Sequence, residues 1–264
     1  MESIAGIIRN FFLSHLEVFA PQRREAMRWK DDGSMAGSAD DDMDKALNVF
    51  LREHFSVPVI SEEQEYSWPP SHKRFWLIDP RDGSNNAARG LYPLVGSMAS
   101  LFEDGEPVFS SIFVPAEERD CGNGFYFAIR NGGAWRWETD HPVQIHVSKT
   151  DRVEKAGLLI EGPSRKVAAD DRVRKLQQAM AWRINLTCAW TFTRLASGFA
   201  DVVVSAHNKP TDALHGILFA REAGGIVTDF NGSPPTLENC TNLLYSNGIL
   251  HDEALNILTL KERM

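Results

Sequence analysis

Few residues of this chain are of the kinds that build disulfide frameworks or zinc sites. Its 264 residues include three cysteines, which are far apart and form no CxxC pair, as is typical of a protein in a reducing compartment. We expect each cysteine to be a small buried side chain. The eight histidines are scattered and contain no HxxxH pair. Because zinc sites need His or Cys clusters, zinc is not expected.

Long apolar runs and an excess of basic residues are also missing. No segment approaches the roughly 20 apolar residues that span a bilayer. The first segment, with Arg9, His15 and Glu17, has no small-residue cleavage site of a signal peptide. The formal net charge of -8 argues against non-specific binding to nucleic acid or to an anionic membrane. We therefore expect a cytoplasmic protein with no nucleic-acid or membrane partner.

What the sequence does contain is enough apolar material for one large domain or two closely joined halves, since 43% of its residues are hydrophobic. In the first half, segments with helical spacing are followed by strand-like segments, and the last four strands are typical of an antiparallel meander. The elements expected there are helices over residues 3–20 and 40–54 and strands over 57–60, 75–78, 95–102, 107–114, 124–130 and 133–137.

Beyond about residue 150 strands and helices alternate, which indicates an α/β arrangement. We expect an α/β (α+β) protein in which residues 1–150 form an N-terminal α+β half and residues 151–264 a C-terminal α/β half of one compact unit. The elements expected in the second half are strands near 158–161, 184–186, 201–205 and 226–229 and helices over 170–180, 190–197 and 212–223.

The most informative segment is WLIDPRDGSN, at residues 76–85. Two carboxylates, Asp79 and Asp82, follow an apolar strand and precede an expected helix start at Ser84. Carboxylates this close repel each other unless a positive group lies between them, and hard divalent cations prefer such oxygen ligands. The N–H groups of a helix start can bind an anion. The segment therefore suggests phosphate chemistry, although the same residues also form ordinary tight turns with solvated carboxylates.

Three further acidic residues lie at strand ends or helix starts, where sites in α/β proteins collect. Glu62 follows the strand at 57–60, and Asp40 and Asp212 open expected helices. Each has an alternative explanation. Asp40 and Asp212 are suited to capping their helices, and Glu62 with Glu63 is suited to the surface. His215 is expected to pack within its helix.

Motifs spaced along nearly the whole chain carry a family resemblance. They are Lys30 with residues 38–40 (SAD), residues 61–63 (SEE), residues 79–84 (DPRDGS), and residues 209–225, which begin KPTDA and end EAGG. Their order and spacing resemble those of the inositol monophosphatase-like, Mg²⁺-dependent, lithium-sensitive phosphatases. The DPRDGS segment is similar to the family's DPxDG(T/S) signature, with arginine where Ile or Leu is usual.

The resemblance implies a layered α/β/α/β/α fold and a site with two or three Mg²⁺ ions, where a metal-activated water attacks a phosphate monoester in line. It also implies a homodimer. The catalytic residues would be Glu62, Ser84 and Asp82. The metal ligands would be Glu62, Asp79, the backbone carbonyl of Arg81, Asp82, Asp212 and, through water to a third ion, Asp40. The residues expected to bind phosphate or substrate are Gly83, Ser84, Asn85, Lys30, Cys188, Ser205 and His207.

The substrate stays open at this stage. Residues 186–189 (LTCA) and Ser205 differ from the residues with which some family members line an inositol pocket. An inositol phosphate, a sugar phosphate and a nucleotide 3′-phosphate are therefore all candidates. The alternatives are a 3′(2′),5′-bisphosphate nucleotidase, or a non-catalytic regulatory or binding protein on the same fold.

Overall fold

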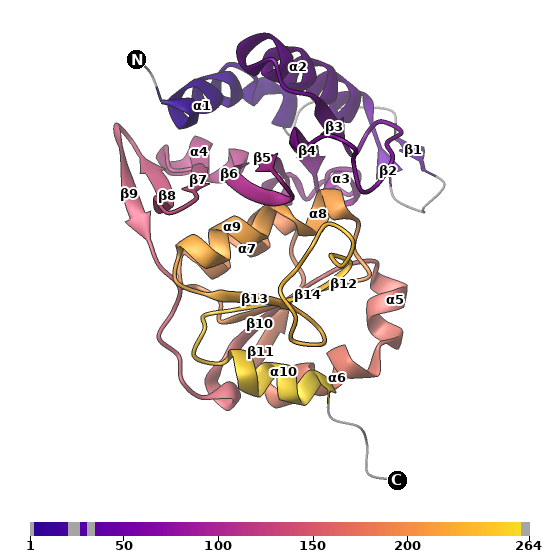
Figure 1. Cartoon of the computed structure of the whole chain (residues 1–264). Coiled ribbons are helices and arrows are strands. Elements are labelled where there is room, and N and C mark those ends of the chain that lie inside the picture. The colour runs from indigo at the N-terminus through magenta and orange to yellow at the C-terminus, as the bar shows by residue number, and fades with distance from the viewer. Residues whose placement is uncertain (1–2, 21–26, 31–34, 260–264) are drawn as a thin grey trace.

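The computed structural model describes residues 3–20, 27–30 and 35–259, and in it helices and the two larger β-sheets alternate in five layers (Figure 1). Helices α1 (Ile4–Ser14) and α2 (Ser38–Phe55) form the outer layer over the first sheet. The helices between the sheets are α7 (Cys188–Ala196) and α9 (His215–Glu222). The helices beyond the second sheet are α5 (Ser164–Ala169), α6 (Asp171–Ala179) and α10 (His251–Thr259). The expected α/β/α/β/α layering is confirmed.

The first sheet has seven strands in chain order, with β3 and β4 parallel and all later pairs antiparallel. The predicted four-stranded meander is therefore confirmed as β5 to β8, and it continues into β9, which was not predicted. Its strands are β3 (Val59–Ser61), β4 (Arg74–Asp82), β5 (Gly96–Glu103), β6 (Glu106–Phe113), β7 (Phe125–Ile129), β8 (Gly133–Glu138) and β9 (His141–Ile145).

The second sheet has five strands in the order β11-β10-β12-β14-β13, with β10 parallel to both of its neighbours. Strand β14 and helix α10 behind it were not predicted. The strands are β10 (Gly157–Glu161), β11 (Trp182–Ile184), β12 (Val202–Ala206), β13 (Ile226–Asp229) and β14 (Asn242–Ser246).

Several predicted helices are shorter or divided. The first ends at Ser14 and is followed by a 3₁₀ turn, and α8 (Pro210–Ala213) precedes α9 where one helix was expected. Helix α4 (Pro115–Cys121), between β6 and β7, was not predicted. It leaves Cys121 exposed, so the expectation of burial is wrong for that cysteine and confirmed for the other two. The remaining short elements are β1 (Arg28–Trp29), β2 (Met35–Ala36) and 3₁₀ turns at Leu16–Phe19, Tyr92–Leu94 and Val153–Lys155.

The first sheet is buried on both faces, as strand β5 shows. Met98 and Phe102 belong to the core between the two sheets, while Ala99 and Leu101 belong to the core under α1 and α2. Successive side chains of a strand point to opposite faces, so residues on both faces of β5 are buried, the small polar Ser97 and Ser100 among them. This explains why its sequence lacks the alternation of a half-exposed strand.

His215 lies in the layer between the sheets, where its ring is fully buried and its Nδ1 is 2.7 Å from the Ser100 hydroxyl. Burial lowers the pKa of His215 to about 3. The expected packing role of this histidine is confirmed. The division of the chain at about residue 150 stays a prediction. Among the described residues, none of the helices combines the length and the hydropathy of a membrane span.

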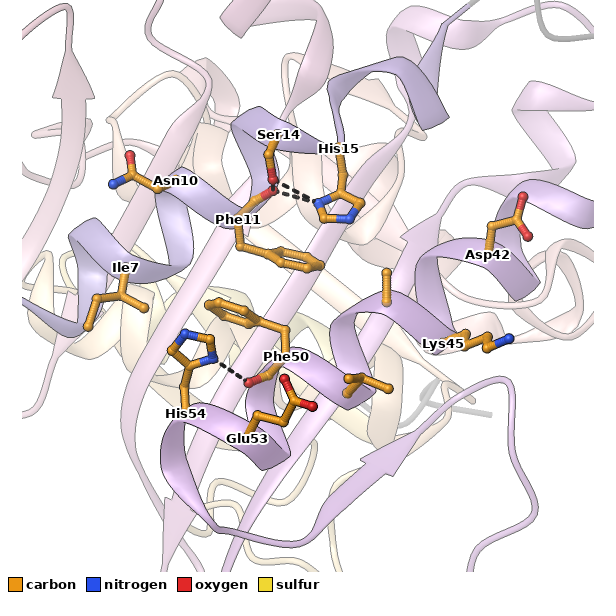
Figure 2. A pocket seen from close by; sticks show the side chains of 12 residues that line it. Ile7, Asn10, Phe11, Ser14, His15, Asp42, Lys45, Phe50, Glu53 and His54 are labelled. Carbon is orange, nitrogen blue, oxygen red and sulfur yellow. Dashed lines mark hydrogen bonds between the residues drawn. The ribbon is translucent and has the colours of Figure 1, made fainter.

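A groove of about 900 Å³ lies between α1 and α2 (Figure 2). Phe11 and Phe50 meet in it, with stacked rings whose centroids are 4.4 Å apart. His15 and His54 border it and bond through Nδ1 to the backbone oxygens of Phe11 and Phe50. None of the acidic residues singled out in the sequence lines this groove, so the candidate site lies elsewhere.

Candidate metal centre

Strand β4 brings both acids of the DPRDGS segment into the sheet. It continues past Ile78 to Asp82, and its pairing with β5 shifts register between Asp79 and Asp82. Residues three apart in a regular strand face opposite sides of the sheet, whereas a bulge redirects side chains. In a regular strand Asp79 and Asp82 would lie on opposite faces of the sheet. The irregularity brings their carboxylates close enough to interact, and the charge of Asp82 is among those that raise the pKa of Asp79.

Three carboxylates from distant parts of the chain converge at this end of the sheet. Glu62 follows β3, and its N–H donates to the Ile78 carbonyl on the parallel strand β4 (3.1 Å). Asp212 comes from α8, whose first turn reaches the same point. One oxygen each from Glu62, Asp79 and Asp212 lie within 4.8 Å of one another. The structure thus brings together three of the predicted metal ligands.

Burial and mutual repulsion raise the free energy of the ionised form of this carboxylate cluster. Burial, and next the charge of Glu62, raise the pKa of Asp79 and of Asp212 well above the usual range. Two lysines compensate in part. Lys209 Nζ donates to Glu62 Oε1 at 3.1 Å, and Lys30 Nζ lies 3.6 Å from the same carboxylate and 2.7 Å from Glu63. An all-oxygen donor set that repels itself fits a hard divalent cation.

Asp82 lies beside this cluster and contacts the first turn of α7. Its Oδ2 accepts a hydrogen bond from the Ala189 N–H at 2.6 Å. Burial raises the pKa of Asp82 to about 7, against the lowering effect of this hydrogen bond. Asp82 therefore has one oxygen bound to α7.

Arg81, between the two acids of β4, forms a buried ion pair with Asp40 in the first turn of α2. The Arg81 side chain is 1% exposed, and its Nη1 lies 3.0 Å from Asp40 Oδ2. Asp40 also accepts from the Gly37 N–H at 2.7 Å and from the Ser84 hydroxyl. The Arg81 carbonyl oxygen lies 3.0 Å from the same hydroxyl. The carboxylate expected to bind a third ion is thus occupied by donors from the chain itself.

The turn after β4 needs glycine at position 83. Gly83 has φ of +91° and caps α3 (Ser84–Ala87). A Cβ at this position would lie 2.6 Å from the Leu94 carbonyl oxygen and 2.8 Å from a Thr187 methyl group. The turn leaves Asn85 exposed and Ser84 half-buried.

A sixth acid, Glu161, was not predicted to belong to the site. It ends β10, is 7% exposed, accepts a hydrogen bond from the Thr191 hydroxyl and lies 3.8 Å from the Cys188 thiol. Burial, then the charge of Asp82, raise the pKa of Glu161 well above its usual range. Its signal was an acid at the end of an apolar strand, the same pattern that identified Asp79.

The remaining predicted substrate residues differ in their surroundings. Ser205 is buried, and its hydroxyl accepts from the Asn208 amide at 2.9 Å. His207 has φ of +58°, and its Nε2 lies 3.1 Å from Asp170 Oδ2. The guanidinium of Arg172 lowers the pKa of Asp170 to about 2. His207 is therefore held beside the start of α6, and its contact with substrate stays a prediction.

The fold and this carboxylate site agree with one family. The chain belongs to the inositol monophosphatase family, whose model matches residues 16–261. Among curated relatives, it is 30% identical over 236 residues to the chloroplastic phosphatase IMPL1 of Arabidopsis thaliana, a match that spans 81% of this chain and 59% of that protein. It is also 30% identical over 190 residues to the fructose-1,6-bisphosphatase/inositol-1-monophosphatase of Thermotoga maritima, covering 70% of this chain and 68% of that protein.

The solved structures agree on the fold. One of them, an IMPase/NADP phosphatase complexed with Mg²⁺ and phosphate, superimposes with a TM-score of 0.81 at 20% identity and covers 97% of this chain and 95% of that one. The matching region is about three fifths of the Arabidopsis protein. The names of the relatives agree with the predicted class, a phosphoric monoester hydrolase.

Proposed function

We propose that this chain is a Mg²⁺-dependent phosphomonoesterase that hydrolyses a small phosphate ester. The observation that carries the proposal is the convergence of Glu62, Asp79 and Asp212, whose oxygens lie within 4.8 Å of one another. Mg²⁺ bound there would neutralise substrate charge and make a water molecule more acidic. Two or three ions would be held by these carboxylates, by Asp82 and by the backbone carbonyl of Arg81.

Two lysines give the site an affinity for anions. Lys30 and Lys209 contact Glu62 from separate elements, at 3.6 and 3.1 Å. Lys30 also lies 2.7 Å from Glu63, and with Glu62 bound to a metal ion the two ammonium groups would add positive charge beside the phosphate. A phosphate monoester is a dianion, so positive groups at the rim favour its binding and its orientation.

Ser84 is suited to orient the attacking water. Its hydroxyl hydrogen is directed at Asp40, which also accepts from Arg81. A hydroxyl whose hydrogen is engaged still has oxygen lone pairs with which to accept. A water molecule that donates to Ser84 Oγ, with Glu62 as a second acceptor, would have an oxygen lone pair directed at phosphorus. Asp40 would accept the proton if Ser84 passes it on.

The turn at Gly83 would hold the phosphate oxygens. Its positive φ turns the chain from the end of β4 into α3, and the N–H groups of Gly83, Ser84 and Asn85 would then face a phosphate bound at the carboxylate cluster. Backbone N–H groups in such a turn bind anions. The ester group would then face Cys188, Ser205 and His207, which we propose as substrate contacts.

An inositol phosphate, a sugar phosphate or a nucleotide 3′-phosphate would be the substrate, in a lithium-sensitive, cytoplasmic homodimer. The test is phosphate release from a panel of these esters and 3′-phosphoadenosine 5′-phosphate, with Mg²⁺, with EDTA, and with Mg²⁺ plus Li⁺. Asp212→Asn should lower the Mg²⁺-dependent rate by orders of magnitude. Asp151→Asn, which neutralises an exposed carboxylate outside the site, should leave the rate unchanged.

Each outcome has a definite meaning. A preference for 3′-phosphoadenosine 5′-phosphate would identify a bisphosphate nucleotidase. Full activity of Asp212→Asn in Mg²⁺, or equal release in EDTA, would contradict the assigned site. If no ester is hydrolysed although Mg²⁺ binds, the proposal of a phosphomonoesterase is wrong for this panel, and the non-catalytic binding protein is favoured.

A further inference from the structure

We propose that Arg81 is a positioning residue whose permanent positive charge holds Asp40 beside Ser84. As a consequence, Asp40 binds no metal ion. This inference rests on the proposed function and deepens it. It concerns the one position of the DPRDGS segment where a charged side chain replaces an aliphatic one.

The first support is the geometry of the ion pair. The Arg81 and Asp40 side chains are 1% and 0% exposed, and Nη1 lies 3.0 Å from Oδ2. A buried carboxylate needs a compensating positive charge close by. Arg81 supplies this charge permanently, since a guanidinium keeps its proton in proteins.

The second support is that hydrogen-bond donors already contact both oxygens of Asp40. Oδ2 accepts from Arg81 and from the Gly37 N–H, at 3.0 and 2.7 Å. Oδ1 accepts from the Ser84 hydroxyl. A metal ion bound to Oδ1 would have to displace the Ser84 hydroxyl. A metal ion bound to Oδ2 would be repelled by the guanidinium of Arg81. Asp40 also lies outside the set of converging carboxylates found in the described residues.

The third support is that two parts of Arg81 lie close to the Ser84 hydroxyl or to its acceptor. Its side chain holds Asp40, which accepts the serine hydrogen, and its own carbonyl oxygen lies 3.0 Å from Ser84 Oγ. Asp40 is the third residue of α2, whose N-cap is Gly37. The ion pair therefore ties the start of α2 to the end of β4, with the serine between them.

The first experiment counts bound metal ions. Metal-free wild type, Asp40→Asn and Asp212→Asn are each titrated with Mn²⁺, and bound ions are counted by equilibrium dialysis. We expect Asp40→Asn to bind as many ions per chain as the wild type. One ion fewer in Asp40→Asn would overturn the inference. An unchanged count in Asp212→Asn would instead contradict the metal site of the proposed function, so the two failures are distinguishable.

The second experiment tests the connection to Ser84 and uses a variant that keeps the charge. Arg81→Lys retains a cation but loses the fixed guanidinium geometry, so we expect kcat to fall by about 10- to 100-fold with KM and the Mn²⁺ count unchanged. In a Ser84→Ala background, Arg81→Lys should change kcat by less than about twofold, because its effect passes through the serine.

The matched control is Arg28→Lys, which alters the exposed Arg28–Asp41 pair near the start of the same helix. It should change neither kcat nor the metal count. If Arg81→Lys lowers kcat equally with and without Ser84, or raises KM alone, Arg81 does not act through the serine and the inference is wrong. Far-UV circular dichroism of each variant verifies that it is folded before the comparison is made.

Discussion

Removing a site carboxylate should stabilise the protein when no metal is bound. We expect Asp82→Asn to raise the free energy of unfolding of the metal-free protein at about pH 8, although it removes a proposed metal ligand. The reason is that burial raises the pKa of Asp82 from 3.8 to about 7. Ionisation of Asp82 in the folded state is therefore unfavourable, and an uncharged amide of the same shape removes that cost.

The magnitude follows from the pKa. The difference between 3.8 and about 7 corresponds to about 4 kcal/mol at ~1.4 kcal/mol per pH unit. The amide oxygen can still accept from the Ala189 N–H, but a hydrogen bond to an uncharged acceptor is weaker by roughly 1 kcal/mol. The net gain is about 3 kcal/mol. For a chain of this length that is a melting temperature higher by roughly 5–10 °C.

The raised pKa of Asp82 determines how the stability of the metal-free protein changes with pH. Between about pH 4 and pH 7 the folded carboxyl keeps a proton that the unfolded one has lost, so the stability of the metal-free wild type falls as pH rises. The gain from Asp82→Asn should therefore be full above about pH 7 and vanish near pH 4. Thermal melts in EDTA at several pH values measure it, with Asp151→Asn as the control.

Two results would refute this reasoning. One is a loss of stability in Asp82→Asn at pH 8 in EDTA. The other is a gain that is equal at pH 4 and pH 8, because a gain without pH dependence cannot come from the ionised carboxylate.

Three further predictions concern single residues around the site. Gly83→Ala should lower the free energy of unfolding by roughly 1–3 kcal/mol in urea melts, because of the positive φ and a contact 2.6 Å from the Leu94 oxygen. Glu161→Gln should raise the melting temperature in EDTA near pH 8 and not near pH 4, because its pKa is raised in the folded state. Lys209→Met should tighten Mg²⁺ binding several-fold in a calorimetric titration, since Lys209 competes for Glu62; weaker binding would contradict this.

Much of the candidate site could be predicted from the sequence because short motifs contain its residues. Asp79, Asp82 and Gly83 are recognisable from one segment, and the acids at 62 and 212 stand at element ends. Their convergence depends on contacts between residues more than 100 positions apart, which no local pattern encodes. The family resemblance, and not periodicity, supplied the expectation that they meet.

Other features followed from tertiary context. The bulge in β4 depends on its pairing with β5, so the strand was predicted to end at Ile78 and not at Asp82. The direction of the Arg81 side chain depends on Asp40, which lies 41 residues earlier. Glu161 was missed because it had no motif around it, and only the fold places it beside Cys188.

The most direct test of the metal centre is a calorimetric titration of Mg²⁺ into the metal-free wild type and into Asp79→Asn at about pH 8. We predict saturable binding to the wild type and loss of at least one ion in the variant, because Asp79 belongs to the converging carboxylates. Equal Mg²⁺ binding by the two proteins, or no binding by the wild type, would contradict the account.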